Sequence, residues 1–241
     1  MKITILTLFP ELFEPYVTTS IIKKATLQAF VTIECVNIRD FTQDKHHRVD
    51  DAPFGGGAGL VMKVQPILDA IEHVRTPQSK VVYLTPVAPL YTQSHAKKLS
   101  QCEHIILLCG HYEGVDERVL YFVDEVLSIG DYILTGGEVA AMVVMDSIIR
   151  LIPGVISSDS VVSESFEEHL LEYPHYTRPE EYKGMKVPAI LLSGHHANIE
   201  AYRREQALLK TRQYRPDLLE KAKLSKSDRK FLENHPNDVE K

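Results

Sequence analysis

The segment Leu108-Cys-Gly-His-Tyr-Glu-Gly-Val-Asp-Glu-Arg118 and a second one, Ser128-Ile-Gly-Asp-Tyr-Ile-Leu-Thr-Gly-Gly-Glu138, follow the same pattern. Each comes directly after a short apolar run and combines glycines with acidic and aromatic residues. Glycine tolerates positive φ and lets another backbone approach closely, which a side chain prevents. Two such loops at strand ends can enclose a purine-bearing cofactor through backbone groups. Two tight turns with polar tips would have the same composition.

Strand-like and helix-like stretches alternate around these loops, up to about residue 155. Short runs rich in β-branched residues predict strands at Lys2–Leu8, Val31–Ile38, Lys80–Leu84, Ile105–Cys109 and Val123–Leu127. Helical patterns occur at Ser20–Phe30, Pro66–Val74, Thr92–Leu99, Val115–Phe122 and Glu138–Leu151. This alternation is typical of an α/β fold in which helices cover a parallel sheet.

The chain divides on sequence into three parts. Residues 1–156 form the α/β domain, and residues 157–172 form a linker or loop that is rich in serine and acids. Residues 173–241 form a small helical domain. Its helices are predicted at Ile199–Lys210, Asp217–Lys223 and Ser225–Asn234, the last with Ser225 as its cap and Asp228 three residues later.

Composition sets limits on the class of protein. The chain has 241 residues and a formal charge of −6, and no apolar stretch approaches the ~18 residues of a membrane span. Cys35, Cys102 and Cys109 form neither a zinc motif nor a disulfide framework, which favours the cytoplasm. Residues 201–230 carry ten Lys/Arg against four acids. This basic end favours a nucleic-acid partner, although a solvated helical face would have the same count.

A third glycine-rich stretch, Phe54-Gly-Gly-Gly-Ala-Gly59, lacks the Gly-Lys-Ser/Thr ending of a phosphate-binding P-loop. It is either a mobile surface turn or a loop that lets a nucleic-acid backbone or an extruded base come close. On the second interpretation, Asp50, Gly55, Gly56 and Gly57 contact substrate. The histidine pairs at residues 46–47 and 195–196 have no third ligand at metal-site spacing, so we predict no metal site there.

Asp146 and Arg150 lie four residues apart in the helix predicted after the second glycine segment. Such a pair is often a weak surface ion pair. The neighbours of this pair are mostly apolar, however, which predicts a largely buried helix, and a buried arginine usually has a specific partner or role.

The sequence resembles the bacterial tRNA (guanine-N1)-methyltransferase family, TrmD, of the SPOUT superfamily. The resemblance rests on motifs along nearly the whole chain: Leu8-Phe-Pro-Glu-Leu-Phe13, Asp50-Asp51, the three glycine segments above, Ile152-Pro-Gly154, Pro174-His-Tyr-Thr-Arg-Pro179 and Leu191-Leu-Ser-Gly194. It implies a deep trefoil knot in the first domain and an obligate homodimer with active sites at the subunit interface. The implied donor is S-adenosylmethionine, the implied product is 1-methylguanosine at tRNA position 37, and the implied cation is magnesium.

The resemblance also implies roles for individual residues. The implied cofactor contacts are Tyr83, Leu84, Pro86, Gly110, Tyr112, Glu113, Gly114, Ser128, Ile129, Gly130, Asp131, Tyr132, Ile133, Leu134, Gly136 and Gly137. Arg150 corresponds to the residue that steadies guanine O6. The basic helices, including Arg203, Arg212 and Arg215, would hold the anticodon arm.

The general base falls in Ser163-Glu-Ser-Phe166, where this chain has Glu164 and the family usually has aspartate. Asp159 is the alternative base. Two other functions stay open on sequence alone: a related methyltransferase that acts elsewhere on RNA, and a non-catalytic RNA-binding regulator. A phosphate-ester hydrolase is disfavoured, because the P-loop lysine and a metal cluster are both missing from the sequence pattern.

Overall fold

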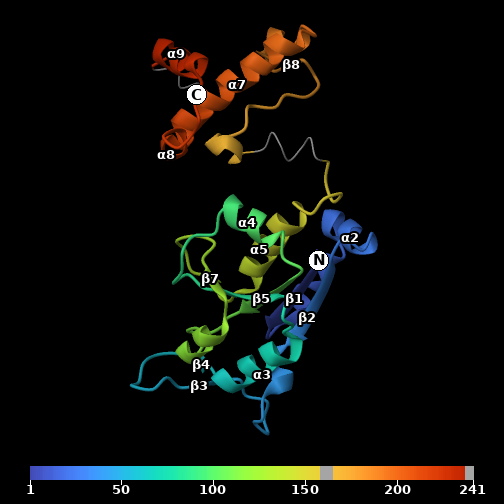
Figure 1. Ribbon diagram of the computed structural model, residues 1–241, viewed down its shortest axis with the longest axis vertical. Coiled ribbons are helices and arrows are strands. Elements are labelled where there is room, and N and C mark those ends of the chain that lie inside the picture. Colours follow the sequence, from blue (N-terminus) through green and yellow to red (C-terminus); the bar gives the residue numbers. More distant parts are fainter. Residues whose placement is uncertain (158–164, 237–241) are drawn as a thin grey trace. The chain divides into compact units, whose positions relative to one another are not determined.

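The computed structural model describes residues 1–157 and 165–236 (Figure 1). The chain divides into two compact units, Met1–Ser157 and Ser158–Lys241. None of the helices described is long and apolar enough to cross a membrane.

The first unit is built on a five-stranded parallel sheet in the order β2-β1-β6-β5-β7. Its strands are β1 (Lys2–Thr7), β2 (Thr32–Asn37), β5 (Ser79–Leu84), β6 (His104–Cys109) and β7 (Glu125–Leu127). This confirms the α/β fold with a parallel sheet. Every residue of β6 is buried, as expected for an apolar strand at the centre of a sheet covered on both faces.

Helices cover both faces of the sheet, because alternate side chains of each strand point to opposite sides. Figure 1 shows α2 (Ser20–Leu27), α4 (Gln93–Leu99) and α5 (Glu138–Ile149) on one side, where Ile3, Ile5, Ile105 and Leu107 join their core. On the other face, α3 (Val64–Val74) and the 3-10 helix η3 (Glu117–Phe122) pack on Leu6, Ile106 and Leu108. The smaller elements are η1 (Pro10–Leu12), α1 (Glu14–Val17), η2 (Ile38–Phe41), β3 (Asp50–Asp51) and β4 (Val61–Met62).

The segment after β7 runs between two other parts of the unit. On one side, Ser128 N–H donates to Pro89 C=O at 2.9 Å, and Tyr91 N–H donates to Ser128 C=O at 2.7 Å. On the other side, Gly137 N–H donates to Gly110 C=O at 2.8 Å. The segment from 128 to 137 is therefore held between the loop that follows β5 and the end of β6.

The second unit is mainly helical. Its elements are η4 (Glu167–His169), the hairpin of β8 (Glu181–Tyr182) and β9 (Met185–Lys186), η5 (Ala189–Leu192), α7 (His196–Tyr214), α8 (Pro216–Leu219) and α9 (Lys226–Asn234). The predicted cap of α9 is confirmed, since Ser225 Oγ accepts from Asp228 N–H at 3.1 Å and Asp228 accepts from Ser225 N–H at 2.9 Å. Compared with the predicted helices, α7 is longer at both ends and α8 ends earlier.

Candidate functional site

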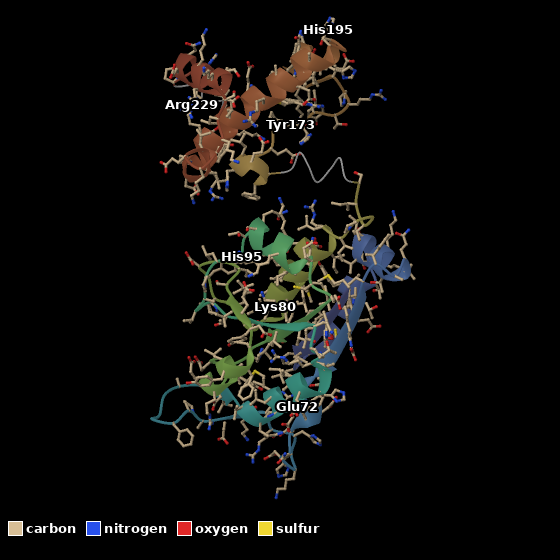
Figure 2. The ribbon with its side chains drawn as sticks, viewed as in Figure 1. Glu72, Lys80, His95, Tyr173, His195 and Arg229 are labelled. Carbon is tan, nitrogen blue, oxygen red and sulfur yellow. The ribbon has the colours of Figure 1, made fainter. Side chains whose placement is uncertain are left out.

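A cavity of about 460 Å³ lies at the carboxyl ends of β5, β6 and β7, against the start of α5. Lys80 in Figure 2 marks the opposite, amino-terminal end of β5. The cavity is lined by these residues singled out on sequence: Tyr83, Leu84, Pro86, Gly110, Tyr112, Glu113, Gly114, Ser128, Ile129, Gly130, Tyr132, Ile133, Leu134, Gly136 and Gly137. Asp131 is not among the lining residues. In open α/β sheets, ligands bind at this edge.

Sequence reasoning missed several lining residues. Thr85, Val87, His111, Val115, Glu117, Leu120, Val126, Leu127, Thr135 and Ala140 also border the cavity. His111 and Thr135 lie inside the glycine segments and could have been found from that position. Leu120 and Val126 contribute from outside both segments, where the sequence carries no signal for them.

Glycine is required where the loops touch. A Cβ atom built on Gly137 would lie 2.8 Å from the Cα of Cys109 and 3.0 Å from the amide nitrogen of Gly110. A Cβ atom built on Gly110 would lie 3.0 Å from the hydroxyl oxygen of Tyr83. Because real Cβ atoms rarely come this close to backbone, the glycine at position 137 lets the two segments meet, and the glycine at position 110 leaves room for the Tyr83 ring.

Cys109 lies beneath this junction and is fully buried. Burial raises the pKa of its thiol well above the ordinary value, and Glu138 adds to the effect. Since the thiolate is the reactive form, Cys109 is a structural residue here and is no nucleophile.

The loop between β3 and β4 is joined to the cavity by backbone hydrogen bonds. Met62 N–H donates to Gly114 C=O at 2.9 Å, and Glu113 N–H donates to Leu60 C=O at 3.0 Å. Asp50 pairs with Met62 in the same two-stranded sheet. The loop that bears Phe54 projects from the unit in Figure 1, and the Phe54 ring is wholly exposed.

Gly55, Gly56 and Gly57 form the tip of this loop, and all three have positive φ. A Cβ atom built on Gly55 or Gly56 would meet no atom within 4 Å. Space above the loop is therefore open, and a planar group could approach its backbone.

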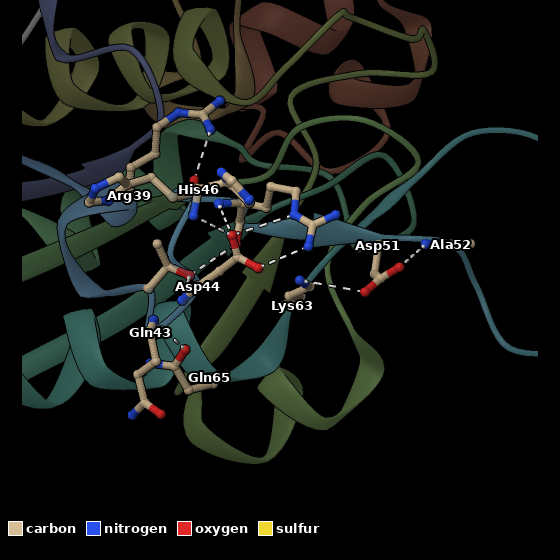
Figure 3. Close-up of polar contacts among 11 residues, drawn as sticks. Arg39, Gln43, Asp44, His46, Asp51, Ala52, Lys63 and Gln65 are labelled. Atoms are coloured by element: carbon tan, nitrogen blue, oxygen red, sulfur yellow. Dashed lines mark hydrogen bonds and ion pairs between the residues drawn. The ribbon is translucent and has the colours of Figure 1, made fainter.

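A basic turn precedes this loop. Figure 3 shows the carboxylate of Asp44 at its centre, where it accepts from His46 N–H at 2.8 Å and from the Arg48 guanidinium at 3.0 Å. The bond from Arg48 holds the pKa of Asp44 well below its usual range. Asp51 forms an ion pair with Lys63 at 3.5 Å. The turn at residues 44–48 is thus held by hydrogen bonds to the Asp44 carboxylate.

Arg150 directly follows α5 and is half-buried, with its N–H bonded to Asp146 C=O at 3.1 Å. The Asp146 carboxylate accepts from the Tyr16 hydroxyl at 2.6 Å. Arg150 is 13 residues beyond Gly137, so at about 1.5 Å per residue it lies about 20 Å along the axis of α5 from this residue of the cavity. Arg150 and the cavity of the same chain are therefore far apart.

The two candidates for the general base, Glu164 and Asp159, lie outside the described residues.

The three arginines predicted to bind RNA all lie in the second unit and have partners there. The Arg203 guanidinium pairs with Glu200 at 2.6 Å and lies 4.9 Å from the centre of the Tyr173 ring. Arg212 donates to Leu232 C=O at 3.3 Å, and Arg215 donates twice to Asp217, each time at 2.8 Å.

Other basic side chains extend the charge of this unit. Arg229, labelled on α9 in Figure 2, and its neighbour Lys230 are exposed on the surface of that helix.

Among the described residues, no three of His, Cys, Asp or Glu are grouped so that they could hold a metal ion.

Known proteins of similar sequence identify the family of this chain. The model of the family described as tRNA (guanine-1)-methyltransferase TrmD matches residues 1–221. A tRNA (guanine-N(1)-)-methyltransferase of Malacoplasma penetrans is 56% identical over 218 residues, which is 90% of this chain and 96% of that protein. One from Caldanaerobacter subterraneus subsp. tengcongensis is 54% identical over 234 residues, 96% and 97% of the two chains. One from Halalkalibacterium halodurans is 49% identical over 246 residues, 100% of both. The chain therefore belongs to the tRNA (guanine-1)-methyltransferase TrmD family.

Proposed function

We propose that this protein transfers a methyl group from S-adenosylmethionine to N1 of guanosine at tRNA position 37, next to the anticodon. The observation that carries the proposal is the cavity where two glycine-rich segments meet at the ends of β5, β6 and β7. The similar proteins are named for methyl transfer to guanine N1 of tRNA. We place the reaction in the cytoplasm, where tRNA is available and the three free cysteines stay reduced.

The residues around the cavity fit S-adenosylmethionine. Close backbone approach at Gly110 and Gly137 leaves amide and carbonyl groups, not side chains, to contact an adenosine. Leu84, Ile129 and Leu134 supply apolar walls, and Glu113 supplies a carboxylate. When bound, this donor supplies a methyl group on a positively charged sulfur. The protein holds and orients that methyl group and excludes water, since effective placement accounts for much of the rate of such a transfer.

The deep trefoil knot is part of the proposal. Its support is the segment 128–137, which is hydrogen-bonded to Pro89 and Tyr91 on one side and to Gly110 on the other. We propose that this segment threads through the loop formed by the earlier chain before it continues into α5, which would make the knot. Such threading is rare in proteins, so its retention is best explained by the rigid pocket that it forms.

Guanine N1 carries a proton and becomes a good nucleophile only when that proton leaves. We assign its removal to Glu164, with Asp159 as the alternative, because a positioned carboxylate can accept it. Arg150 is assigned to guanine O6, where negative charge grows as the proton leaves. The target base leaves the anticodon loop stack to enter the site, which is how enzymes reach ring atoms of nucleotides.

This assignment of Arg150 requires a second copy of the chain. Arg150 lies about 20 Å along α5 from Gly137 in the cavity of its own chain, beyond the reach of its side chain. We therefore propose a homodimer in which the Arg150 of one copy serves the cavity of the other. Val139 and Val143 favour such an interface, because they lie one helical turn apart on α5 and are 55% and 46% exposed.

The acceptor tRNA would be held from two sides. The open loop of Gly55, Gly56 and Gly57, beside Asp50, faces the extruded base, and the arginines of the second unit contact phosphates. Magnesium, which the family resemblance implies, has no ligand cluster among the described residues. No step proposed here depends on a metal bound by those residues.

Turnover with labelled S-adenosylmethionine tests the function. The substrates are two tRNA transcripts with G36, one carrying G37 and the other A37, and the product nucleoside is mapped by mass spectrometry. We expect 1-methylguanosine at position 37 from the first transcript and no label in the second. Methylation elsewhere would identify a different RNA methyltransferase, and donor binding without turnover on any tRNA would favour a regulator.

A further inference from the structure

Glu138 is a buried carboxylate that the proposed reaction does not use. It is the first residue of α5, and only 4% of it is exposed. Its Oε1 accepts from the hydroxyl of Thr7, a fully buried residue at the end of β1, at 2.8 Å. Among the ion pairs of the described residues, none involves Glu138. The helix amino terminus favours the negative charge, but a buried carboxylate normally has further hydrogen-bond donors.

His111 provides the complementary group. Its ring lines the cavity and lies between Phe9 and Tyr112, with ring centres 5.0 Å and 4.9 Å away. Its Nδ1 is buried and has no hydrogen-bond partner among the described residues. A buried nitrogen without a partner costs free energy, so an arrangement of the site that supplies one is favoured.

Both groups converge on Gly136. A Cβ atom built on Gly136 would lie 2.6 Å from His111 Nδ1 and would also collide with Glu138 Oε2. His111 and Gly136 are bridged by backbone hydrogen bonding, so the imidazole and the carboxylate are held next to each other by the chain itself. His111 Nδ1 and Glu138 Oε2 therefore both lie less than 3 Å from the same point beside Gly136.

We propose that His111 Nδ1–H donates a hydrogen bond to Glu138 Oε2 across Gly136, and that this pair fixes the shape of the donor pocket. The inference rests on the proposed function, since it assumes that the cavity binds S-adenosylmethionine. The chain Thr7–Glu138–His111 connects the ends of β1 and β6 with the start of α5. Glu138 is thus a positioning residue: it holds the imidazole in the Nδ1–H form, which leaves Nε2 as an acceptor on a ring that lines the cavity.

The affinity for S-adenosylmethionine of four variants, two at His111 and two at a control histidine, tests the hydrogen bond between His111 and Glu138. Asparagine places its amide nitrogen near the position of Nδ1, and glutamine places its own near Nε2. We expect His111→Asn to keep the Kd for S-adenosylmethionine within about threefold of the unchanged protein, and His111→Gln to raise it about tenfold, the effect of losing one charge-assisted hydrogen bond. His73→Asn and His73→Gln, at an exposed histidine beside Phe41, should both leave the Kd unchanged. Equal losses for the two His111 variants would overturn the proposal.

The tautomer of His111 gives a readout that needs no donor. Nitrogen-15 NMR of the full chain should show a protonated Nδ1 at neutral pH. Glu138→Gln should shift the ring toward the Nε2–H form, because the new amide would donate to Nδ1. An Nε2–H imidazole in the unchanged protein would end the proposal even if the variant failed to fold. If the unchanged protein shows the expected tautomer but binds no S-adenosylmethionine, the pair stands and the proposed function fails.

Discussion

Gly137 and Cys109 are in contact at the junction of α5 and β6, where a Cβ atom on the glycine would lie 2.8 Å from the Cα of the cysteine. Both residues lie at the ends of regular elements, since Cys109 is the last residue of the central strand β6 and Gly137 is the N-cap of α5. Neither can move without shifting the segments that line the cavity. This single contact therefore links the packing of the core to the shape of the pocket.

Gly137→Ala should consequently damage both stability and donor binding. We expect a loss of about 1–3 kcal/mol in the free energy of unfolding, as for overpacked cores, and at least a tenfold weaker affinity for S-adenosylmethionine. Denaturant unfolding and calorimetry measure the two. Gly55→Ala is the control: its Cβ would meet nothing, so only the cost of its φ of +86° remains, about 1–2 kcal/mol, with donor affinity unchanged. Unchanged donor binding in Gly137→Ala would show that the pocket adapts.

The environment of His104 lets us predict how the free energy of unfolding depends on pH. The imidazole is buried between Thr4 Oγ1 at 2.9 Å and Ser79 Oγ at 2.7 Å. Burial, and then the charge of Lys2, lower its pKa below the ordinary 6.5. The unfolded chain therefore binds a proton more readily than the folded one, so this contribution is complete above pH 6.5 and is lost as the pH falls through the lowered pKa. Thermal unfolding from pH 8 to pH 5 should show this loss, and His104→Asn should show a shallower one. Parallel curves for the two proteins would contradict the assignment.

Local patterns were enough to predict the sheet and most of its helices. Strand β6 and helix α5 are both largely buried, and burial leaves a direct mark on the sequence as a run or a helical spacing of apolar residues. The hairpin of β8 and β9 was missed because its strands have only two residues each and are exposed, so no alternation of buried and exposed residues marks them. The stretch predicted as a helix from Val115 begins as the 3-10 helix η3 only at Glu117.

The parts of the site that glycines mark could be predicted from the sequence. The parts that depend on contacts between residues distant in the sequence could not. The helix predicted at Glu138–Leu151 already implies that Arg150 is far along the axis from the glycine loop, and the observed length of α5 agrees. The free nitrogen of His111 depends on contacts with Phe9 and Gly136, which are remote from it in sequence. No single-sequence pattern encodes such a contact.

The distance between Arg150 and the cavity leads to a subunit-mixing prediction. Arg150→Ala and Gly110→Val should each abolish methylation as homodimers, the second because its Cβ would lie 3.0 Å from the Tyr83 hydroxyl. Unfolded together and refolded as a mixture, they should recover about a quarter of the unchanged activity, since half of the dimers contain one intact site of two. Complete inactivity of the mixture, with mixed dimers present by mass spectrometry, would place Arg150 and the donor on the same chain.

The arginines of the second unit should differ in what they do. Arg203→Ala and Arg215→Ala remove charges at partly exposed sites, so each should weaken tRNA binding and lower the salt slope by about one. Arg212→Ala also removes the bond to Leu232 C=O near the end of α9 and should destabilise this unit as well. Filter binding across salt concentrations and thermal unfolding separate the two effects. Lys23→Ala, at an exposed position of α2, is the matched charge control and should change neither tRNA binding nor stability. An unchanged salt slope in all three arginine variants would remove them from the tRNA interface.

The last prediction concerns the general base. Glu164→Gln keeps the size of the side chain but removes its charge, so donor affinity should hold while the single-turnover methylation rate falls by about 10²–10⁴-fold. Glu164→Asp should retain much of the activity, because aspartate has the same charge and a similar ordinary pKa. Asp159→Asn is the matched variant of the alternative base and should stay active. If Glu164→Gln is active and Asp159→Asn is not, the base is Asp159. Comparable rates for all variants would mean that neither acid removes the proton.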